Sequence, residues 1–97
     1  MFISITTSKV KYDQTTKVEK FLNKLLPRLK QHTGVHAVYH YSKPEKNEET
    51  TVTIWENEDA WKRYQQSDLL KEAMAFEQQM NLPSTREAYP LLLAIVD

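Results

Sequence analysis

Three histidines stand four residues apart, at His32, His36 and His40. On a helix this spacing would place them on one face and indicate a metal site. The residues around His36 and His40 instead predict a strand, where a residue rises roughly 3.3 Å and the two side chains lie about 13 Å apart. Each ligand nitrogen must come within about 2.0–2.1 Å of an ion, so these two cannot share one. We therefore predict no metal site.

His40 keeps a second chemical possibility, because a histidine can exchange a proton near neutral pH. It lies between Tyr39 and Tyr41 and is expected to face a neighbouring strand. We name it as a candidate proton-transfer base. The alternative is a half-exposed strand histidine with no chemical role.

The stretch "WENEDAWKRYQQSD" (55–68) brings Trp55, Trp61 and Tyr64 close together. The indoles offer flat apolar surfaces on which an aromatic substrate could stack, and the Tyr64 hydroxyl could bind a substrate oxygen or relay a proton. The alternative is structural: the tryptophans pack in the core or a dimer interface, and the Tyr64 ring is buried with its hydroxyl at the surface.

The acidic residues of this stretch have a structural explanation. Asn57 is a good helix N-cap, and Glu58 and Asp59 place negative charge where the helix dipole favours it. Ser67 and Asp68 resemble a second cap. We therefore expect a helix start here and no catalytic carboxylate cluster, and we assign the charges of "EKNEE" (45–49) to a solvated turn.

The elements that must position these residues follow from hydrophobic periodicity. "FISITT" (2–7), "GVHAVYHYS" (34–42) and "TTVTIW" (50–55) predict strands. A broad apolar stripe predicts a helix over 12–34, bent at Pro27 and ending near Gly34. Two helices follow, from Asn57 and from Ser67–Asp68 to Met80. "NLPSTREAYP" (81–90) contains two prolines and breaks the pattern, and "LLLAIV" (91–96) predicts the last strand.

The expected order is therefore β-α-β-β-α-α-β, an α+β sandwich of ferredoxin-like type formed by one domain over residues 1–97. Helices should cover one face of the sheet. The other face and "LLLAIV" would leave a large apolar patch on a lone monomer. We therefore expect a homodimer in which two sheets meet face to face as a dimeric α/β barrel.

Composition excludes several function classes. The chain has 13 basic and 13 acidic residues, which gives no electrostatic footprint for nucleic acid or anionic lipid. No apolar run is long enough to cross a membrane. Cysteine is absent, which removes disulfides and thiolate chemistry, and the single glycine cannot form a glycine-rich phosphate loop. The start of the sequence does not resemble a secretory signal, so we expect a cytoplasmic protein.

"VTIWENEDAWKRYQQSDLLKEAM" (52–74) resembles the antibiotic biosynthesis monooxygenase family, whose members are small dimeric α/β-barrel proteins. The shared features are a strand that ends in an aromatic residue, an acidic turn, an alanine–aromatic pair, a further aromatic residue, and "SD" at the start of the next helix. "TGVHAVYHYS" fits the family's second strand. The element order extends the resemblance to nearly the whole chain.

The resemblance implies oxidation of an aromatic or quinol-like substrate by dioxygen, without a metal or flavin cofactor. A deprotonated substrate of this kind reacts with oxygen itself, so the protein need only bind it, exclude water and move a proton. A second branch of the family degrades haem. That branch has tryptophan at the position of Tyr64, an iron-ligating histidine at the position of Met74 and an asparagine in the first strand, and this sequence has none of the three.

We therefore predict an oxygenase with Tyr64 and His40 as the catalytic candidates. Its ligand pocket would lie between the sheet and the helices, with Trp61, Met74, Phe21 and Leu25 on its wall. On the last helix, Met74, Phe76 and Met80 could line a pocket, and plain core packing is their alternative. Two other functions stay open: a non-catalytic dimeric module that binds a small apolar ligand or a partner, and a variant haem-handling protein.

Overall fold

The computed structural model describes residues 1–95. Along the chain the elements are β1 (Phe2–Lys9), the 3-10 helix η1 (Tyr12–Gln14), α1 (Thr15–Lys30), β2 (Val35–Lys43), the 3-10 helix η2 (Pro44–Lys46), β3 (Glu48–Trp55), α2 (Glu58–Gln65), α3 (Asp68–Met80) and β4 (Ser84–Pro90). Apart from the two 3-10 turns, this is the predicted β-α-β-β-α-α-β order. The ferredoxin-like α+β class is confirmed.

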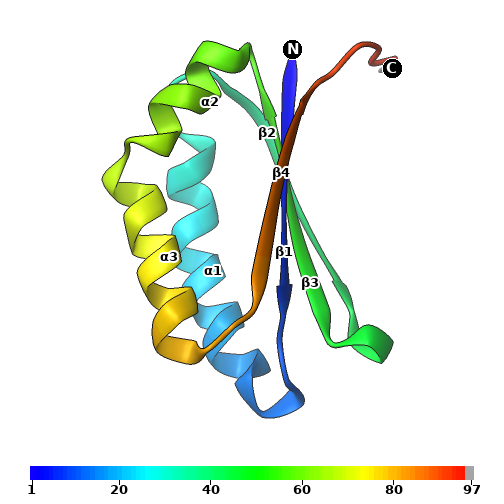
Figure 1. Cartoon of the computed structure of the whole chain (residues 1–97), viewed down its shortest axis with the longest axis vertical. Helices are drawn as coiled ribbons and strands as arrows, with labels where there is room; N and C mark the ends of the chain where they lie inside the picture. Colours follow the sequence, from blue (N-terminus) through cyan, green and yellow to red (C-terminus); the bar gives the residue numbers. More distant parts are fainter. Residues whose placement is uncertain (96–97) are drawn as a thin grey trace.

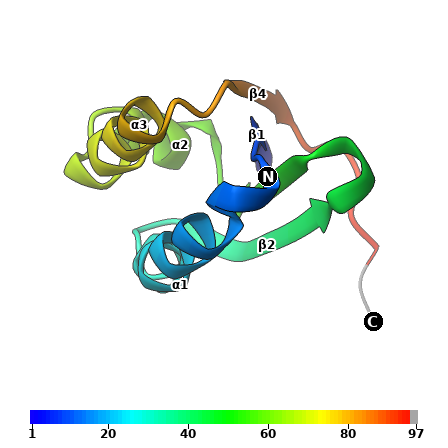
Figure 2. The same cartoon turned by 90° about the horizontal axis from the view of Figure 1, so that it is seen from below.

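The four strands form one antiparallel sheet in the order β2-β3-β1-β4. The three α-helices lie together on one face of this sheet, with α2 and α3 beside α1 (Figures 1 and 2). No helix among the described residues covers the opposite face. The sheet therefore has an inner, helix-covered face and an outer face.

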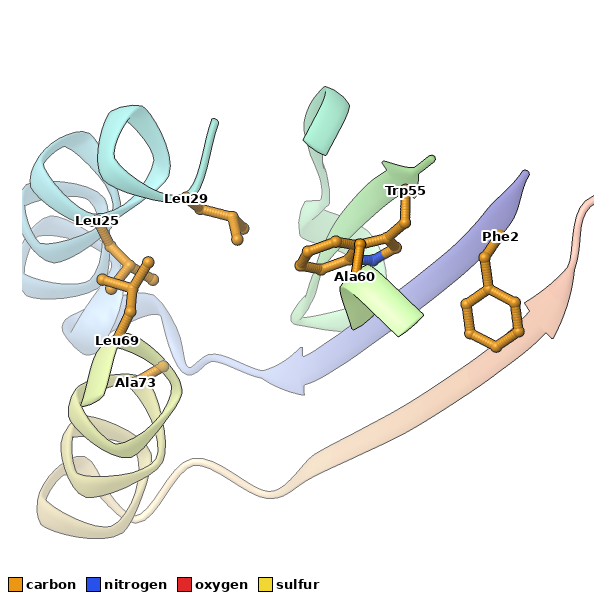
Figure 3. Packing of buried hydrophobic residues seen from close by; sticks show 7 residues of the cluster. All are labelled: Phe2, Leu25, Leu29, Trp55, Ala60, Leu69 and Ala73. Atoms are coloured by element: carbon orange, nitrogen blue, oxygen red, sulfur yellow. The ribbon is translucent and has the colours of Figure 1, made fainter. Parts of the chain in front are cut away.

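The hydrophobic core lies between the inner face and the helices, and Figure 3 shows its main cluster. Its buried members come from both layers: Phe2, Leu25, Leu29, Trp55, Ala60, Leu69 and Ala73. Trp55 is fully buried, and its indole Nε1 donates a hydrogen bond of 2.9 Å to Ser4 Oγ on β1. Packing, the alternative proposed for Trp55, is thus the role that the structure shows.

Both predicted helix caps are present. The Asn57 side chain accepts a hydrogen bond from the backbone N–H of Ala60, and the Ser67 hydroxyl accepts one from Leu70. These bonds satisfy backbone donors that have no partner inside the helix. The second cap starts α3 at Asp68, only a few residues after α2 ends at Gln65.

The first helix is shorter than predicted and continues through its proline. It begins at Thr15 and ends at Lys30, with Pro27 inside it. Gly34 lies beyond the helix, where the chain enters β2 with a φ of +84°. A Cβ at this position would lie 2.5 Å from the Cβ of Ala60 on α2. Gly34 therefore provides both the left-handed backbone and the space that lets α2 pack closely.

The predicted last strand is wrong. The fourth strand is Ser84–Pro90, within the proline-containing segment 81–90, and residues 91–95 lie outside the sheet. Prolines are tolerated here because β4 is an edge strand and Pro90 stands at its end. The pairing between β4 and β1 ends at the first residue of β1, where Phe2 faces Pro90. Just beyond it, the backbone N–H of Leu91 donates a hydrogen bond of 2.9 Å to Met1 O.

Residues 91–95, the apolar tail that follows β4, are not part of the sheet. Leu92 and Ile95 are 93% and 86% exposed. Val96 of the predicted strand lies outside the described residues. Residues 91–95 thus leave the sheet, and residues 92–95 are exposed in the single chain.

Candidate functional site

A cavity of about 310 Å³ lies between the inner face of the sheet and the helices. Its walls differ in chemistry. The helices contribute mainly apolar and aromatic side chains, among them Phe21, Leu22, Leu25, Trp61, Tyr64, Leu70, Ala73 and Phe76. The sheet contributes mainly polar ones, among them Ser4, Thr6, Ser8, His40, Glu49, Thr51, Thr53 and Arg86. The cavity therefore has an apolar roof and a hydrogen-bonding floor.

Strand register explains the polar floor. His40 on β2 pairs with Thr51 on β3, Thr51 with Thr6 on β1, and Thr6 with Arg86 on β4. Paired residues in an antiparallel sheet project to the same face, so these four form one polar row across the inner face. Towards the other end of the strands, the row through Trp55 and Phe2 is apolar and belongs to the core. The inner face of the sheet is thus polar towards one end of the strands and apolar towards the other.

His40 is held by both ring nitrogens. Nε2 lies 2.7 Å from Glu49 Oε1, and Nδ1 lies 2.9 Å from Thr51 Oγ1. The side chains of His40 and Glu49 are only 22% and 15% exposed. The imidazole is therefore fixed in orientation at the floor of the cavity, with a carboxylate on one side and a hydroxyl on the other.

Arg86 closes the opposite end of the polar row. Its guanidinium forms a two-pronged ion pair with Glu77 on α3, at 2.9 Å from Nη1 to Oε1 and 2.6 Å from Nη2 to Oε2. This geometry is the strongest form of the arginine–carboxylate bond. It ties the edge strand β4 to α3 and places a neutralised charge pair beside the cavity.

Tyr64 combines a packed ring with a hydroxyl near these charges. Its ring lies 5.2 Å from that of Trp55 and 5.6 Å from that of His32 between centroids. Burial raises the pKa of the phenol, the nearby Arg86 opposes that shift, and Glu77 adds to it. Among residues 1–95, no hydrogen bond joins the hydroxyl to another side chain. A neutral phenol is thus available to a ligand as donor or acceptor.

The aromatic roof is preassembled by contacts between elements. Phe21 on α1 stacks on Phe76 on α3, with ring centroids 3.9 Å apart and planes within 2° of parallel. Trp61 on α2 packs against Phe2 on β1 at 5.2 Å. The first pair joins α1 to α3, and the second joins α2 to the sheet.

Five of the six predicted site residues line this cavity: Tyr64, His40, Trp61, Phe21 and Leu25. Met74 does not, and its predicted place in the pocket is wrong. It is 49% exposed, because the inward side of α3 is set by Leu70 and Ala73, and the next residue projects about a quarter-turn further round the helix. Phe76 lines the cavity instead.

The sequence interpretation missed Glu49, Thr51, Glu77 and Arg86. Glu49 was assigned to a solvated turn, but it lies inside β3 and in the cavity. Residues two apart in a strand face the same side, so the spacing of Thr53, Thr51 and Glu49 indicates that all three share one face of β3. The partnership of Arg86 with Glu77 had no signal, because "STREAYP" was not recognised as a strand.

Within residues 1–95, no group of three or more acidic or histidine side chains is placed to hold a metal ion. The three histidines lie apart in structure: His32 packs against aromatic rings, His36 lies at a strand irregularity, and His40 is in the cavity. In the same part of the chain, no helix has the length and apolar character that a membrane crossing requires.

Comparison with known proteins identifies the family. The model of the antibiotic biosynthesis monooxygenase family ("Antibiotic biosynthesis monooxygenase") matches residues 1–75. No curated protein matches the sequence.

Solved structures agree in fold at low sequence identity. A protein of Deinococcus radiodurans, described as an antibiotic biosynthesis monooxygenase, has a TM-score of 0.89 at 16% identity, covering 100% of this chain and 98% of its own. A conserved protein of Methanosarcina mazei has a TM-score of 0.79 at 16% identity, covering 91% and 89%. The cofactor-independent oxygenase SnoaB of Streptomyces nogalater has a TM-score of 0.79 at 12% identity, covering 99% and 97%.

Proposed function

Because the chain belongs to the antibiotic biosynthesis monooxygenase family, we propose that it is a monooxygenase that oxidises an aromatic or quinol-like substrate with dioxygen and without a bound metal or flavin. The observation that carries this proposal is the cavity with an aromatic roof and a hydrogen-bonding floor. A flat substrate would place its ring faces against the apolar side chains and its oxygen-bearing edge towards the polar row. Its cavity volume of about 310 Å³ suits a small aromatic molecule.

The chemistry needs little from the protein besides binding and proton transfer. Removal of a proton makes the substrate carbanion-like and able to reduce oxygen. For a ring methylene the overall change is CH₂ plus O₂ giving C=O plus H₂O, so the substrate supplies all the electrons and no external reductant is consumed. His40 is the proposed base on the floor. Tyr64 would donate a hydrogen bond to a substrate oxygen, because burial favours its neutral form.

One observation favours the second candidate, a non-catalytic module that binds a small apolar ligand. Both nitrogens of His40 are already bonded, so neither is directly open to a substrate. In such a module the same cavity would hold the ligand, and the polar row would only orient it. Oxygen consumption separates the two functions.

The deciding experiment is oxygen uptake with a panel of quinols and naphthols. We expect uptake with at least one of them, and we expect Tyr64→Phe to lower the rate roughly 100- to 1,000-fold, as for loss of one positioned hydrogen-bond donor. Tyr12→Phe is the matched control, because Tyr12 is 92% exposed and does not line the cavity. Absence of uptake with every member of the panel would contradict the oxygenase and leave the binding module.

A further inference from the structure

The hydrogen bonds of His40 determine which of its nitrogens carries the proton. An ionised carboxylate can only accept hydrogen bonds, so Glu49 Oε1 at 2.7 Å requires a proton on Nε2. In a neutral imidazole the other nitrogen, Nδ1, is then the lone-pair acceptor. The partner of Nδ1 is Thr51 Oγ1 at 2.9 Å, so the Thr51 hydroxyl must donate its proton to the ring.

This arrangement moves the reactive contact from His40 to Thr51. The Thr51 hydroxyl covers the basic nitrogen, and Thr51 is one of the residues that line the cavity. A hydroxyl that donates its proton keeps lone pairs that can accept a hydrogen bond. A substrate hydroxyl on the floor would therefore meet an acceptor whose own proton is already directed at a base. Thr51 also pairs with Thr6 in the centre of the polar row, below the aromatic roof.

We propose that Thr51, His40 and Glu49 form a proton relay in which Thr51 Oγ1 contacts the substrate, His40 Nδ1 is the base, and Glu49 positions the imidazole. The substrate O–H bond breaks as its proton passes to Thr51 Oγ1, and the Thr51 O–H bond breaks as its proton passes to Nδ1. The substrate becomes an oxyanion and His40 an imidazolium. That imidazolium then donates from Nδ1 to Thr51 and from Nε2 to Glu49, so the existing geometry also fits the product.

The relay rests on the proposed function for its biological role, but its proton chemistry needs no oxygen and can be measured separately. Two readouts serve. Nitrogen NMR of the His40 ring, assigned by the signal lost in His40→Gln, reports the tautomer of the neutral imidazole. The absorbance of bound para-nitrophenol reports whether a phenol in the cavity is ionised.

Wild-type protein should show the Nε2–H tautomer alone. Glu49→Gln should show both tautomers, because an amide can either accept from or donate to Nε2. A role of Glu49 in packing alone would not produce that change. Observation of the Nδ1–H tautomer in the wild type would overturn the relay, whatever the activity.

Para-nitrophenol should ionise on wild type and on Thr51→Ser, which keeps the hydroxyl. On Thr51→Val, which has nearly the same shape without the hydroxyl, the ionised fraction should fall at least tenfold. The matched control is Thr50→Val, because Thr50 is the adjacent residue of β3 and bonds Thr7 on the outer face. Thr50→Val should behave like wild type.

The outcomes separate the two proposals. Equal ionisation on Thr51→Val and wild type, or failure of wild type to bind and ionise para-nitrophenol, would overturn the relay. Normal ionisation without oxygen uptake from any quinol or naphthol would contradict only the oxygenase function.

Discussion

Tyr64 shows how one side chain can serve both packing and chemistry. Its ring lies beside those of Trp55 and His32 at the edge of the core, and the residue also lines the cavity. The two alternatives weighed for this residue are therefore not exclusive. Burial raises the pKa of the phenol, which keeps it a hydrogen-bond donor over the whole neutral range.

Its raised pKa predicts a contribution to the pH dependence of stability. The folded pKa lies above the ordinary value of 10.0, so the neutral phenol stabilises the fold at lower pH, and this stabilisation is lost as pH rises from about that value through the folded pKa. Urea unfolding at neutral and alkaline pH should therefore show a smaller alkaline loss for Tyr64→Phe than for wild type. Tyr12→Phe should keep the full loss, and equal losses for Tyr64→Phe and wild type would contradict the buried phenol.

At the scale of elements, the close approach of α2 to the start of β2 depends on a residue pair. Gly34 has a positive φ, and the Cβ of Ala60 occupies the place that a side chain at position 34 would need. Ala60 is completely buried, so it has no free space into which to move. This contact fixes α2, and through α2 the positions of Trp61 and Tyr64 in the roof.

Gly34→Ala should lower the free energy of unfolding by about 1–3 kcal/mol, from backbone strain together with the clash. Ala60→Gly should also destabilise, by about 1 kcal/mol, through lost helix propensity. The double variant should be more stable than the sum of the two losses predicts, because the clash is relieved while the backbone strain remains. Chemical denaturation of all four proteins measures this coupling, and strict additivity would show that the contact carries no energy.

At the scale of the whole molecule, no helix or strand within residues 1–95 covers the outer face of the sheet or the tail at residues 91–95. Ile3, Ile5, Val52 and Ile54 lie on the outer face, and Tyr39 there is 62% exposed. The tail after β4 adds exposed leucines and Ile95. An apolar surface of this kind marks an interaction site, and we predict that a second copy of the chain covers it.

Light scattering should therefore give twice the chain mass of 11.4 kDa. Val52→Lys places a charge in the middle of the outer face and should shift the protein to monomer. Lys20→Glu is the control, because Lys20 is an exposed residue of α1 on the other side of the molecule. A wild-type monomer would contradict the predicted dimer.

Sequence patterns alone determined the element order, both helix caps and four side chains of the cavity roof. Helical periodicity repeats every few residues and is visible without knowing any partner, which is why Phe21, Leu25, Trp61 and Tyr64 were found. The resemblance in "VTIWENEDAWKRYQQSDLLKEAM" indicated the family, which the match over residues 1–75 confirmed.

Only the tertiary structure decided the last strand and the polar floor. Residues 91–95 are more apolar than "STREAYP". A strand, however, needs a partner to pair with, and the free edge of β1 from Phe2 to Ser8 already pairs with Ser84–Pro90. The floor depends on register in the same way. His40, Thr51 and Glu49 come from two strands whose alignment no local pattern specifies, so their shared hydrogen bonds follow from the assembled sheet.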